Sequence, residues 1–376
     1  MRIAAILVHY HTPELAAAAV EALRRDAHES GLEIEGFLVD NGSDEAGRAL
    51  LASLPFELVE PGANLGFAGG VNLGVLRAAR TRAEMMVLMN PDVQVLPGCL
   101  GALADALSAG AAVAGPRFYW DGGRRMLLPP AEERSHASEL LALLAMREER
   151  QAVRARRRWR EHARRHWEAR QPLASYALSG SLVALTREAW ERVGPFDEGY
   201  RLYFEETDWL RRAERIGLPA RHVPAAEAVH LHGRSAVREP RSSAWFEESA
   251  RRFRERHYGR WFADLLERSD GWLRPRPPAQ PSVSREELDL TRYPFPLWIE
   301  VSPNPTGFPA AAERLDGPPE GAWRLPREVA ERLAGTELRL QVVDVDGREL
   351  AQRVLRVETS GGSSHRPAEA AARASR

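Results

Sequence analysis

The sequence predicts an α/β protein whose main sheet is mostly parallel, and three observations support this fold class. Strand-like and helix-like segments alternate through roughly the first 115 residues. The segment RIAAILVHY is a continuous apolar run, as expected for a strand that is covered on both faces. Polar residues follow the apolar runs, at the strand ends where such a sheet binds its ligands.

The elements can be assigned in order along the chain. Residues 2–10 predict the first strand, and Pro13 suits the first turn of the helix that follows. GFLVD, FELVE and MMVLM predict three further strands, and the glycine-rich NLGFAGGVNLG leads into a helix. The strand ends therefore carry His9-Tyr10, Asp40-Asn41, Asn64 and Asn90-Pro91-Asp92.

Changes in composition predict six regions. A basic segment interrupts the α/β pattern, a proline-rich stretch separates it from strands of period two, and the end is rich in Ser, Gly, Ala and Arg. We expect the two halves of one α/β domain at 1–120 and 176–270, a basic helical insertion between them at 121–175, a linker at 271–284, a small β-rich module at 285–359 and a disordered tail at 360–376.

Composition excludes several classes of protein. The 376 residues carry a net charge of −1, which favours neither nucleic acid nor an acidic partner. A single cysteine excludes a disulfide framework and fits a reducing interior. No apolar run reaches the length of a membrane-spanning helix, about 18 residues. We therefore expect a cytoplasmic protein whose contact with the inner face of the membrane, if it has one, is peripheral.

Residues 147–170 contain ten arginines and two tryptophans. One interpretation is a solvated helix or a mobile insertion. The alternative is a contact with anionic lipid headgroups, because tryptophan and arginine together suit the membrane interface. No recognisable nucleic-acid-binding module accompanies the arginines, which disfavours nucleic acid.

Two segments suggest a nucleotide site. Asp40 could accept the imide N–H of uracil or thymine, or it could form an ordinary turn with its own backbone. The segment from Asn64 to Asn72 presents backbone N–H groups before a helix, which favours phosphate oxygens. It lacks both the GxGxxG spacing and the lysine of a P-loop, and structural packing is the alternative.

Asp92, in MNPDVQV, follows a buried strand and could bind Mg²⁺ or Mn²⁺ beside a diphosphate. The alternative is turn chemistry, since Asn-Pro-Asp favours turns. His230 or His232 could complete the metal shell. Zinc is disfavoured because the sequence has no cysteine cluster and no HExxH spacing.

FEETDW carries three carboxylates before a predicted helix. A partly buried carboxylate with like-charged neighbours has its pKa raised toward the range of a general base. We expect Asp208 to cap the helix, which we predict to begin at Trp209. The alternative is that the acids simply favour the positive end of the helix, which leaves Glu205 and Glu206 unexplained.

The ordered set of motifs resembles family 2 glycosyltransferases of the GT-A fold, in particular the rhamnosyltransferase-like branch. The matching segments are ILVHYHTPE, FLVDNGSDE, NLGFAGGVNLG, VLMNPDVQV, VAGPRFYWDGG, SGSLVALTREAWERVGPFDEGYRLYFEETDW and AVHLHGRS. They cover about residues 3–235 apart from the insertion.

The resemblance implies roles for individual residues. Glu206 falls at the position of the catalytic base, with Glu205 as the alternative, and Asp92 at the metal-binding position, with His230 as a further ligand. The nucleotide would be bound by His9, Tyr10, Asp40, Asn64, Gly66, Phe67, Gly69, Asn72 and Asn90. The acceptor side would include Ser179, Gly180, Asp208 and Trp209.

The sequence departs from the family pattern at three places. Tyr10 is followed by His11 where the family has asparagine, Asn90-Pro91-Asp92 supplies one acid, and Glu206 stands where aspartate is usual. The added methylene could shift the reactive geometry by about an ångström, which matters for catalysis.

We therefore expect an inverting, metal-dependent transferase that moves a sugar from a nucleoside diphosphate to a hydroxyl of a glycan or lipid-linked acceptor in surface-polysaccharide synthesis. The resemblance favours dTDP-L-rhamnose as donor. A nucleotide-sugar-binding protein without transferase activity is the alternative. A nucleotidyltransferase is disfavoured because no glycine-rich loop bearing arginine and lysine follows the first strand.

Overall fold

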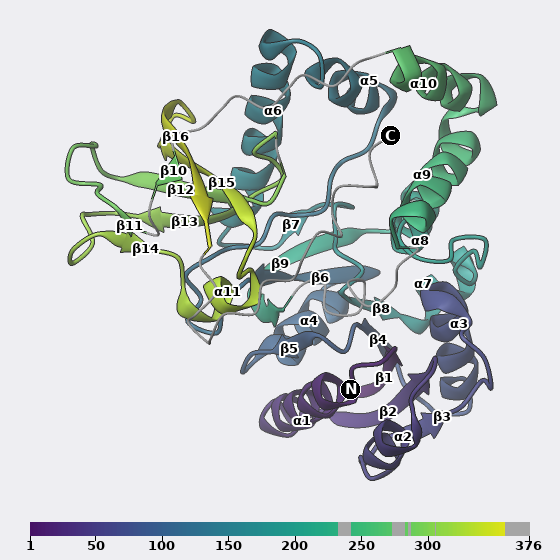
Figure 1. Ribbon diagram of the computed structural model, residues 1–376. Helices are drawn as coiled ribbons and strands as arrows, with labels where there is room; N and C mark the ends of the chain where they lie inside the picture. The colour runs from purple at the N-terminus through teal and green to yellow at the C-terminus, as the bar shows by residue number, and fades with distance from the viewer. Residues whose placement is uncertain (232–241, 273–282, 285–286, 305, 358–376) are drawn as a thin grey trace.

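The computed structural model describes residues 1–376 except 232–241, 273–282, 285–286, 305 and 358–376 (Figure 1). His232, most of the expected linker and all of the expected tail therefore lie outside the described residues. Within them, the fold is the predicted α/β fold with a second, smaller sheet.

The large sheet begins with four parallel strands in the order β3-β2-β1-β4. Each coincides with a predicted strand, because the apolar runs are long enough to be covered on both faces. The strands are β1 (Arg2–His9), β2 (Glu33–Asp40), β3 (Glu57–Val59) and β4 (Met85–Met89).

The sheet continues through β8, β6, β9 and β5. β8 runs antiparallel to β4, β6 and β9 are parallel to each other, and β5 is antiparallel to β9. This part of the sheet brings residues from beyond position 170 beside β4, because β8 pairs with β4. Its strands are β5 (Val93–Val95), β6 (Val113–Tyr119), β7 (Leu173–Ala174), β8 (Leu182–Thr186) and β9 (Ala220–His230), with β7 paired to β9.

Helices cover both faces of this sheet, and β1 shows why. Its residues Ile3, Ala5 and Leu7 enter one buried cluster with α1 and α4, whereas Ala4 and Ile6 enter the other with α3 and α8. The helices are α1 (Pro13–Glu29), α2 (Glu45–Ala52), α3 (Gly66–Ala78), α4 (Cys99–Ser108), α7 (Arg187–Val193) and α8 (Glu205–Arg215).

A five-stranded sheet in the order β10-β16-β15-β12-β13 forms the predicted β-rich module. The predicted hairpin at VDVDGREL joins its two longest strands. Its elements are β10 (Val283–Ser284), β12 (Leu297–Ser302), β13 (Ala311–Leu315), β15 (Glu337–Asp344), β16 (Glu349–Arg356) and α11 (Arg327–Arg332), beside a small pair formed by β11 (Glu287–Leu288) and β14 (Trp323–Arg324).

The basic segment folds mainly as α6 (Glu149–Trp167), which packs against this module (Figure 1). Trp159 and Trp167 are buried, and the ring of Trp167 stacks on Trp298 of β12 with centroids 5.4 Å apart. The expectation that these tryptophans lie in a solvated or membrane-facing surface is therefore wrong. Their apolar area is removed from water in a core that the helix shares with the module.

Three further helices continue from α6 around one edge of the molecule, and the nearest of them, α5, lies beside α6 (Figure 1). α5 (His136–Ala145) contacts α9 (Ser242–Tyr258) through an ion pair of 3.0 Å between Glu139 and Arg254. It contacts α10 (Arg260–Trp272) through the rings of His136 and Phe262.

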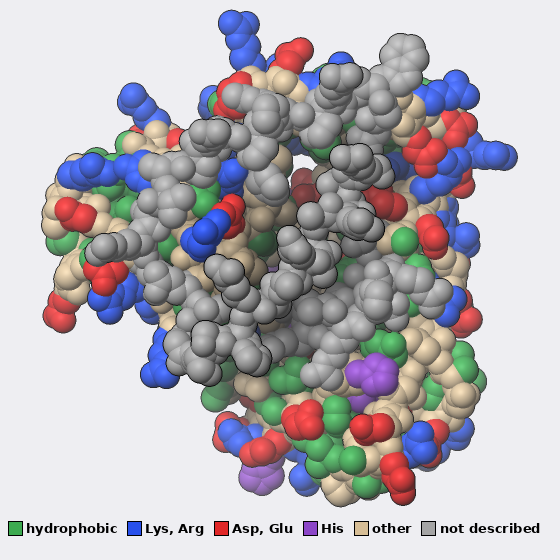
Figure 2. Space-filling model, in the orientation of Figure 1, with side chains coloured by type: hydrophobic (Ala, Val, Ile, Leu, Met, Phe, Trp, Pro, Cys, Tyr) green, Lys and Arg blue, Asp and Glu red, His purple; other side chains and the backbone are tan. Residues whose placement is uncertain are grey.

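Figure 2 shows acidic and basic side chains interspersed over the visible face. No described helix is long and apolar enough to cross a membrane.

Candidate active site

The ends of β1 and β2 bring His9 and Asp40 together. The two residues are register partners, and His9 Nδ1 lies 3.2 Å from Asp40 Oδ1. The backbone N–H of Thr12 donates to His9 Nε2 at 2.7 Å, so Nδ1 carries the proton that is donated to Asp40. Both side chains are buried. His9 therefore orients Asp40 from below the site.

Asp40 is held as a carboxylate. Burial raises its pKa, but hydrogen bonds from His9, the Gly42 N–H and the Ser43 hydroxyl outweigh burial and lower the pKa to about 2. The bond to Gly42 is the turn that the sequence offered as an alternative. The same carboxylate thus makes the turn and stays charged. Neither Asp40 nor His9 lines the pocket described next, whereas the neighbouring Asn41 and Tyr10 do.

A pocket opens above these strand ends, and it contains five predicted nucleotide-binding residues. Tyr10, Asn64, Gly66, Phe67 and Asn90 line it together with six residues that were not predicted: Val8, Asn41, Pro91, Arg201, Leu202 and Trp245.

Asn41 and Arg201 are the most informative of the residues missed. Asn41 Nδ2 donates to the Gly66 carbonyl at 2.9 Å, and its Oδ1 accepts from the Leu65 N–H at 3.2 Å, so it fixes the glycine-rich loop. The Arg201 guanidinium lies over the Trp245 ring, 5.2 Å from its centroid. Arg201 thus places a cation beside the loop that the sequence predicts to bind phosphate.

Asn72 and Gly69 do not line this pocket. The Asn72 amide donates to the Phe196 carbonyl at 3.0 Å and accepts from the Phe196 N–H at 2.9 Å. It thereby joins α3 to a loop 124 residues away. Gly69 is buried, and a methyl group there would lie 2.9 Å from Leu65 Cβ. The structure therefore gives these two residues packing roles and contradicts the expected contact with nucleotide.

Asp92 and His230, the two predicted metal ligands, lie together. The backbone N–H of Leu231 donates to the Asp92 carbonyl, which sets His230 Nε2 at 3.4 Å from Asp92 Oδ1. Among the described residues, no group of three or more His, Cys, Asp or Glu side chains could hold a metal. One carboxylate and one imidazole are enough protein ligands for Mg²⁺ or Mn²⁺, because these ions take their other ligands from substrate phosphate and water.

The segment FEETDW turns sharply before α8. Tyr203 and Phe204 both have φ of 68°, a left-handed conformation that bulky residues rarely adopt. α8 begins at Glu205, four residues earlier than expected. The three acids fall in its first turn, where the helix dipole favours negative charge.

Glu206, and not Glu205, faces a pocket. Glu206 is half-buried and lines a cavity with Arg134, Tyr176, Tyr203 and other residues. Burial raises its pKa, although hydrogen bonds from its own N–H and from Thr207 oppose this. A raised pKa in a pocket suits a residue that takes up a proton near neutral pH.

Glu205 is buried, and its Oε2 has no hydrogen-bond partner among the described atoms. Burial and the neighbouring Glu206 raise its pKa well above the ordinary value. The pKa of the Tyr203 phenol is raised by burial and then by the carboxylates of Glu205 and Asp92. Tyr203 therefore lies in the electrostatic field of acids from both halves of the chain.

Asp208 and Trp209 do not reach a pocket. Asp208 accepts from His257 at 2.8 Å and from Arg212 at 2.9 Å, and it makes no capping bond. Trp209 Nε1 donates to the Gly194 carbonyl from within the core. Both residues were expected on the acceptor side, and Asp208 was also expected to cap the helix, but in the structure they anchor α8 instead.

The segment just before β8 contacts both the end of β4 and the start of α8. The Asn90 N–H donates to the Ser181 carbonyl at 2.9 Å, beside Asp92 in sequence. Gly180 packs directly on Glu206, and Ser179 donates to the Ser181 hydroxyl at 3.0 Å. The predicted metal and base positions are therefore joined by one short segment.

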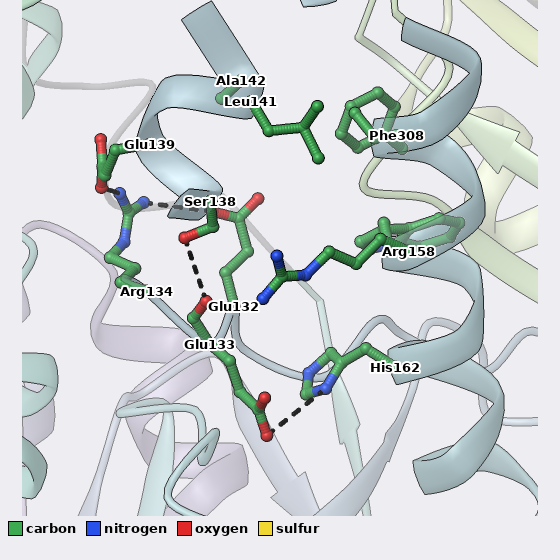
Figure 3. Close-up of a pocket in the computed structure, with 12 residues that line it drawn as sticks. Glu132, Glu133, Arg134, Ser138, Glu139, Leu141, Ala142, Arg158, His162 and Phe308 are labelled. Atoms are coloured by element: carbon green, nitrogen blue, oxygen red, sulfur yellow. Dashed lines mark hydrogen bonds and ion pairs between the residues drawn. The ribbon is translucent and has the colours of Figure 1, made fainter. Parts of the chain in front are cut away.

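A further pocket lies between α5 and α6 and shares Glu132 and Arg134 with the Glu206 pocket. Figure 3 shows Arg158 and His162 projecting into it from α6, opposite Glu133. The pocket beside Glu206 is therefore a neighbour of one that lies beneath the basic helix.

Comparison with known proteins identifies the family of the chain. The model of the family described as glycosyl transferase family 2 matches residues 5–165, which include most of the segment predicted as an insertion. The N-acetylglucosaminyl-diphospho-decaprenol L-rhamnosyltransferase of Mycobacterium tuberculosis, in strains CDC 1551 and H37Rv, is 30% identical over 244 residues, which cover 61% of this chain and 77% of that protein.

The chain belongs to glycosyltransferase family 2. This family 2 glycosyltransferase is rhamnosyltransferase-like. Among solved structures it is similar to the mannosyltransferase PcManGT from Pyrobaculum calidifontis in complex with GDP-Man and Mn²⁺ (16% identity, TM-score 0.43, covering 72% of this chain and 69% of that one). It is also similar to residues 1–349 of S. aureus TarS (13% identity, TM-score 0.44, covering 72% and 70%).

Proposed function

We propose that this glycosyltransferase transfers L-rhamnose from dTDP-L-rhamnose, with inversion, to a hydroxyl of a lipid-linked glycan used in cell-surface polysaccharide synthesis. The observation that carries the proposal is the short segment before β8, in which Ser181 accepts a hydrogen bond from Asn90, two positions before Asp92, and Gly180 packs on Glu206. The mycobacterial relative, whose name specifies L-rhamnose and a diphospho-decaprenol acceptor, supports this choice of sugar and acceptor.

Asp40 and Arg201 would hold the donor. The Asp40 carboxylate, charged and oriented by His9, would accept the imide N–H of thymine. Arg201 and the loop at Asn64 and Gly66 would contact the diphosphate, since guanidinium and backbone N–H groups suit phosphate oxygens. Asp92 and His230 would hold Mg²⁺ or Mn²⁺, which when bound neutralises charge on the departing diphosphate.

Glu206 would act as the general base. It would accept the proton of the acceptor hydroxyl while that oxygen forms a bond to the anomeric carbon and the bond from this carbon to the diphosphate breaks. The products are the rhamnosylated acceptor and dTDP. Attack opposite the leaving group inverts the anomeric configuration. Glu205 would stay protonated behind it, because it is buried and its pKa is raised.

The direct test measures dTDP release from dTDP-L-rhamnose in the presence of an N-acetylglucosaminyl-diphospho-lipid, with and without Mn²⁺. We expect Glu206→Gln to bind dTDP normally but to lose turnover by about 10²-fold or more. The matched control is Glu188→Gln, an exposed acid of α7. Full turnover by Glu206→Gln would refute the base assignment, and binding without turnover in the wild type, across a panel of sugar nucleotides and acceptors, would favour the nucleotide-sugar-binding alternative.

A further inference from the structure

Exposed apolar side chains gather on the edge formed by α5, α10 and the start of α6. Twelve large apolar residues are exposed among the described residues, and six of them lie on this edge. Trp261 is the most exposed of the six, at 68%. The six residues, which we call the apolar edge, are Leu140, Leu144, Met146, Val153, Trp261 and Leu265.

The apolar edge follows from helix geometry. Leu140 and Leu144 are four residues apart on α5, and Trp261 and Leu265 are four apart on α10, so each pair projects from one side of its helix. Because His136 of α5 packs against Phe262 of α10, the two helices are neighbours. Contiguous exposed apolar side chains of this kind mark interaction surfaces.

Unpaired arginines border the apolar edge. Arg150 and Arg154 project with Val153 from the outer side of α6, and they have no hydrogen bond or ion pair with the side chains that the structure describes. Figure 2 shows basic side chains projecting from this upper edge of the molecule. Two nearby acids have partners within the protein: Asp264 pairs with Arg251 at 3.1 Å, and Glu149 with Arg156 at 3.1 Å.

We infer that the apolar edge binds the surface of an anionic lipid bilayer. Exposed leucine, methionine and tryptophan would enter the boundary between headgroups and acyl chains, while Arg150 and Arg154 meet lipid phosphates. This surface overlaps the one expected from sequence, because Arg150, Val153 and Arg154 lie within residues 147–170. It does not include Trp159 and Trp167, which are buried against the C-terminal module.

The pocket between α5 and α6 lies between the apolar edge and the proposed active site. Leu141 and Ala142 line this pocket (Figure 3), whereas Leu140 and Leu144 on the same helix are exposed. Glu132 and Arg134 line both this pocket and the pocket of Glu206, so the two pockets are neighbours. If the proposed function holds, this arrangement would place a lipid-linked acceptor near the base while its lipid stays in the bilayer.

The test is sedimentation of the full chain with vesicles of equal parts phosphatidylglycerol and phosphatidylcholine, and with pure phosphatidylcholine. We expect preferential binding to the anionic vesicles. Leu144→Ser with Trp261→Ser, and separately Arg150→Ser with Arg154→Ser, should each weaken that binding by about tenfold. Matched controls on the other half of the molecule are Leu76→Ser on α3 and Arg24→Ser on α1, both exposed.

Two outcomes would overturn the inference. One is that both double variants bind the anionic vesicles as strongly as the wild type does. The other is a change of oligomeric state in Leu144→Ser with Trp261→Ser, measured by light scattering without lipid, which would make the apolar edge a contact between protein chains. Rhamnosyl transfer to a water-soluble acceptor reports separately on the proposed function. If the wild-type protein binds anionic vesicles but does not transfer rhamnose to a water-soluble acceptor, the transferase proposal is refuted and the lipid-binding assignment of the apolar edge is retained.

Discussion

Gly180 lies so close to Glu206 that a methyl group on its Cα would stand 2.5 Å from Glu206 Cγ. No side chain could occupy that position without moving the glutamate. Gly180 precedes β8, whereas Glu206 is in the first turn of α8. The loop before the strand therefore fixes where the proposed base can stand.

Gly180→Ala tests this positioning. The methyl group should displace the Glu206 carboxylate and lower kcat by about 10²-fold, because a shift of an ångström is costly at a reacting centre. Gly317→Ala is a suitable control, since a methyl group there meets nothing within 4 Å. Thermal unfolding and dTDP binding should change little in either variant. Unchanged kcat in Gly180→Ala would show that Glu206 does not need this position.

Glu205→Gln should make stability less dependent on pH. The folded-state pKa of Glu205 is raised above that of the unfolded chain, first by burial. Its contribution is therefore most favourable below the unfolded pKa, about 4.3, and is lost as pH rises toward the folded pKa. We expect Glu205→Gln to melt higher than wild type at pH 8, with a smaller difference at pH 5. Equal differences at both pH values would contradict the buried, protonated Glu205.

Much of the candidate site could be predicted because strand ends share one edge of a sheet. Asp40, Asn90 and Asp92 follow apolar runs whose identity as strands is clear from composition. Arg201 and Trp245 could not be found in this way, since tertiary packing brings them to the pocket from a distant loop and from α9. The Asn72 amide was misassigned because its partner at Phe196 is invisible to local pattern.

The buried side of the basic helix α6 is predictable from the spacing of its alanines and tryptophans. Ala152, Ala155, Trp159, Ala163 and Trp167 recur at intervals of three and four residues, which predicts one buried side of a helix. The arginines interspersed among these residues obscure the spacing in the sequence. Which surface would cover that side could not be predicted, because the C-terminal sheet lies more than a hundred residues further along the chain.

Arg201→Ala should weaken dTDP binding by about tenfold, through loss of a charge-assisted contact with the diphosphate. Thymidine, which lacks the diphosphate, should bind both proteins alike. Isothermal titration with both ligands measures the difference, and Arg215→Ala at the exposed end of α8 is the control. Equal loss of thymidine affinity would instead indicate that Arg201 supports the pocket through its contact with Trp245.

Arg160 of α6 and Glu300 of β12 form a buried, two-bond ion pair at 2.7 and 2.8 Å. Because Glu300 is fully buried, Arg160→Ala would leave its charge unpaired, at a cost of about 3–5 kcal/mol. Arg157→Ala, which removes an exposed pair with Glu161, should change stability by less than about 0.5 kcal/mol.

Thermal and urea unfolding of the two variants measure this difference. Arg160→Met combined with Glu300→Leu removes both charges and should recover most of the stability lost in Arg160→Ala, because no buried charge is then left without a partner. Similar melting of Arg160→Ala and Arg157→Ala would show that the aromatic packing of Trp159 and Trp167 holds α6 on the C-terminal sheet without help from this ion pair.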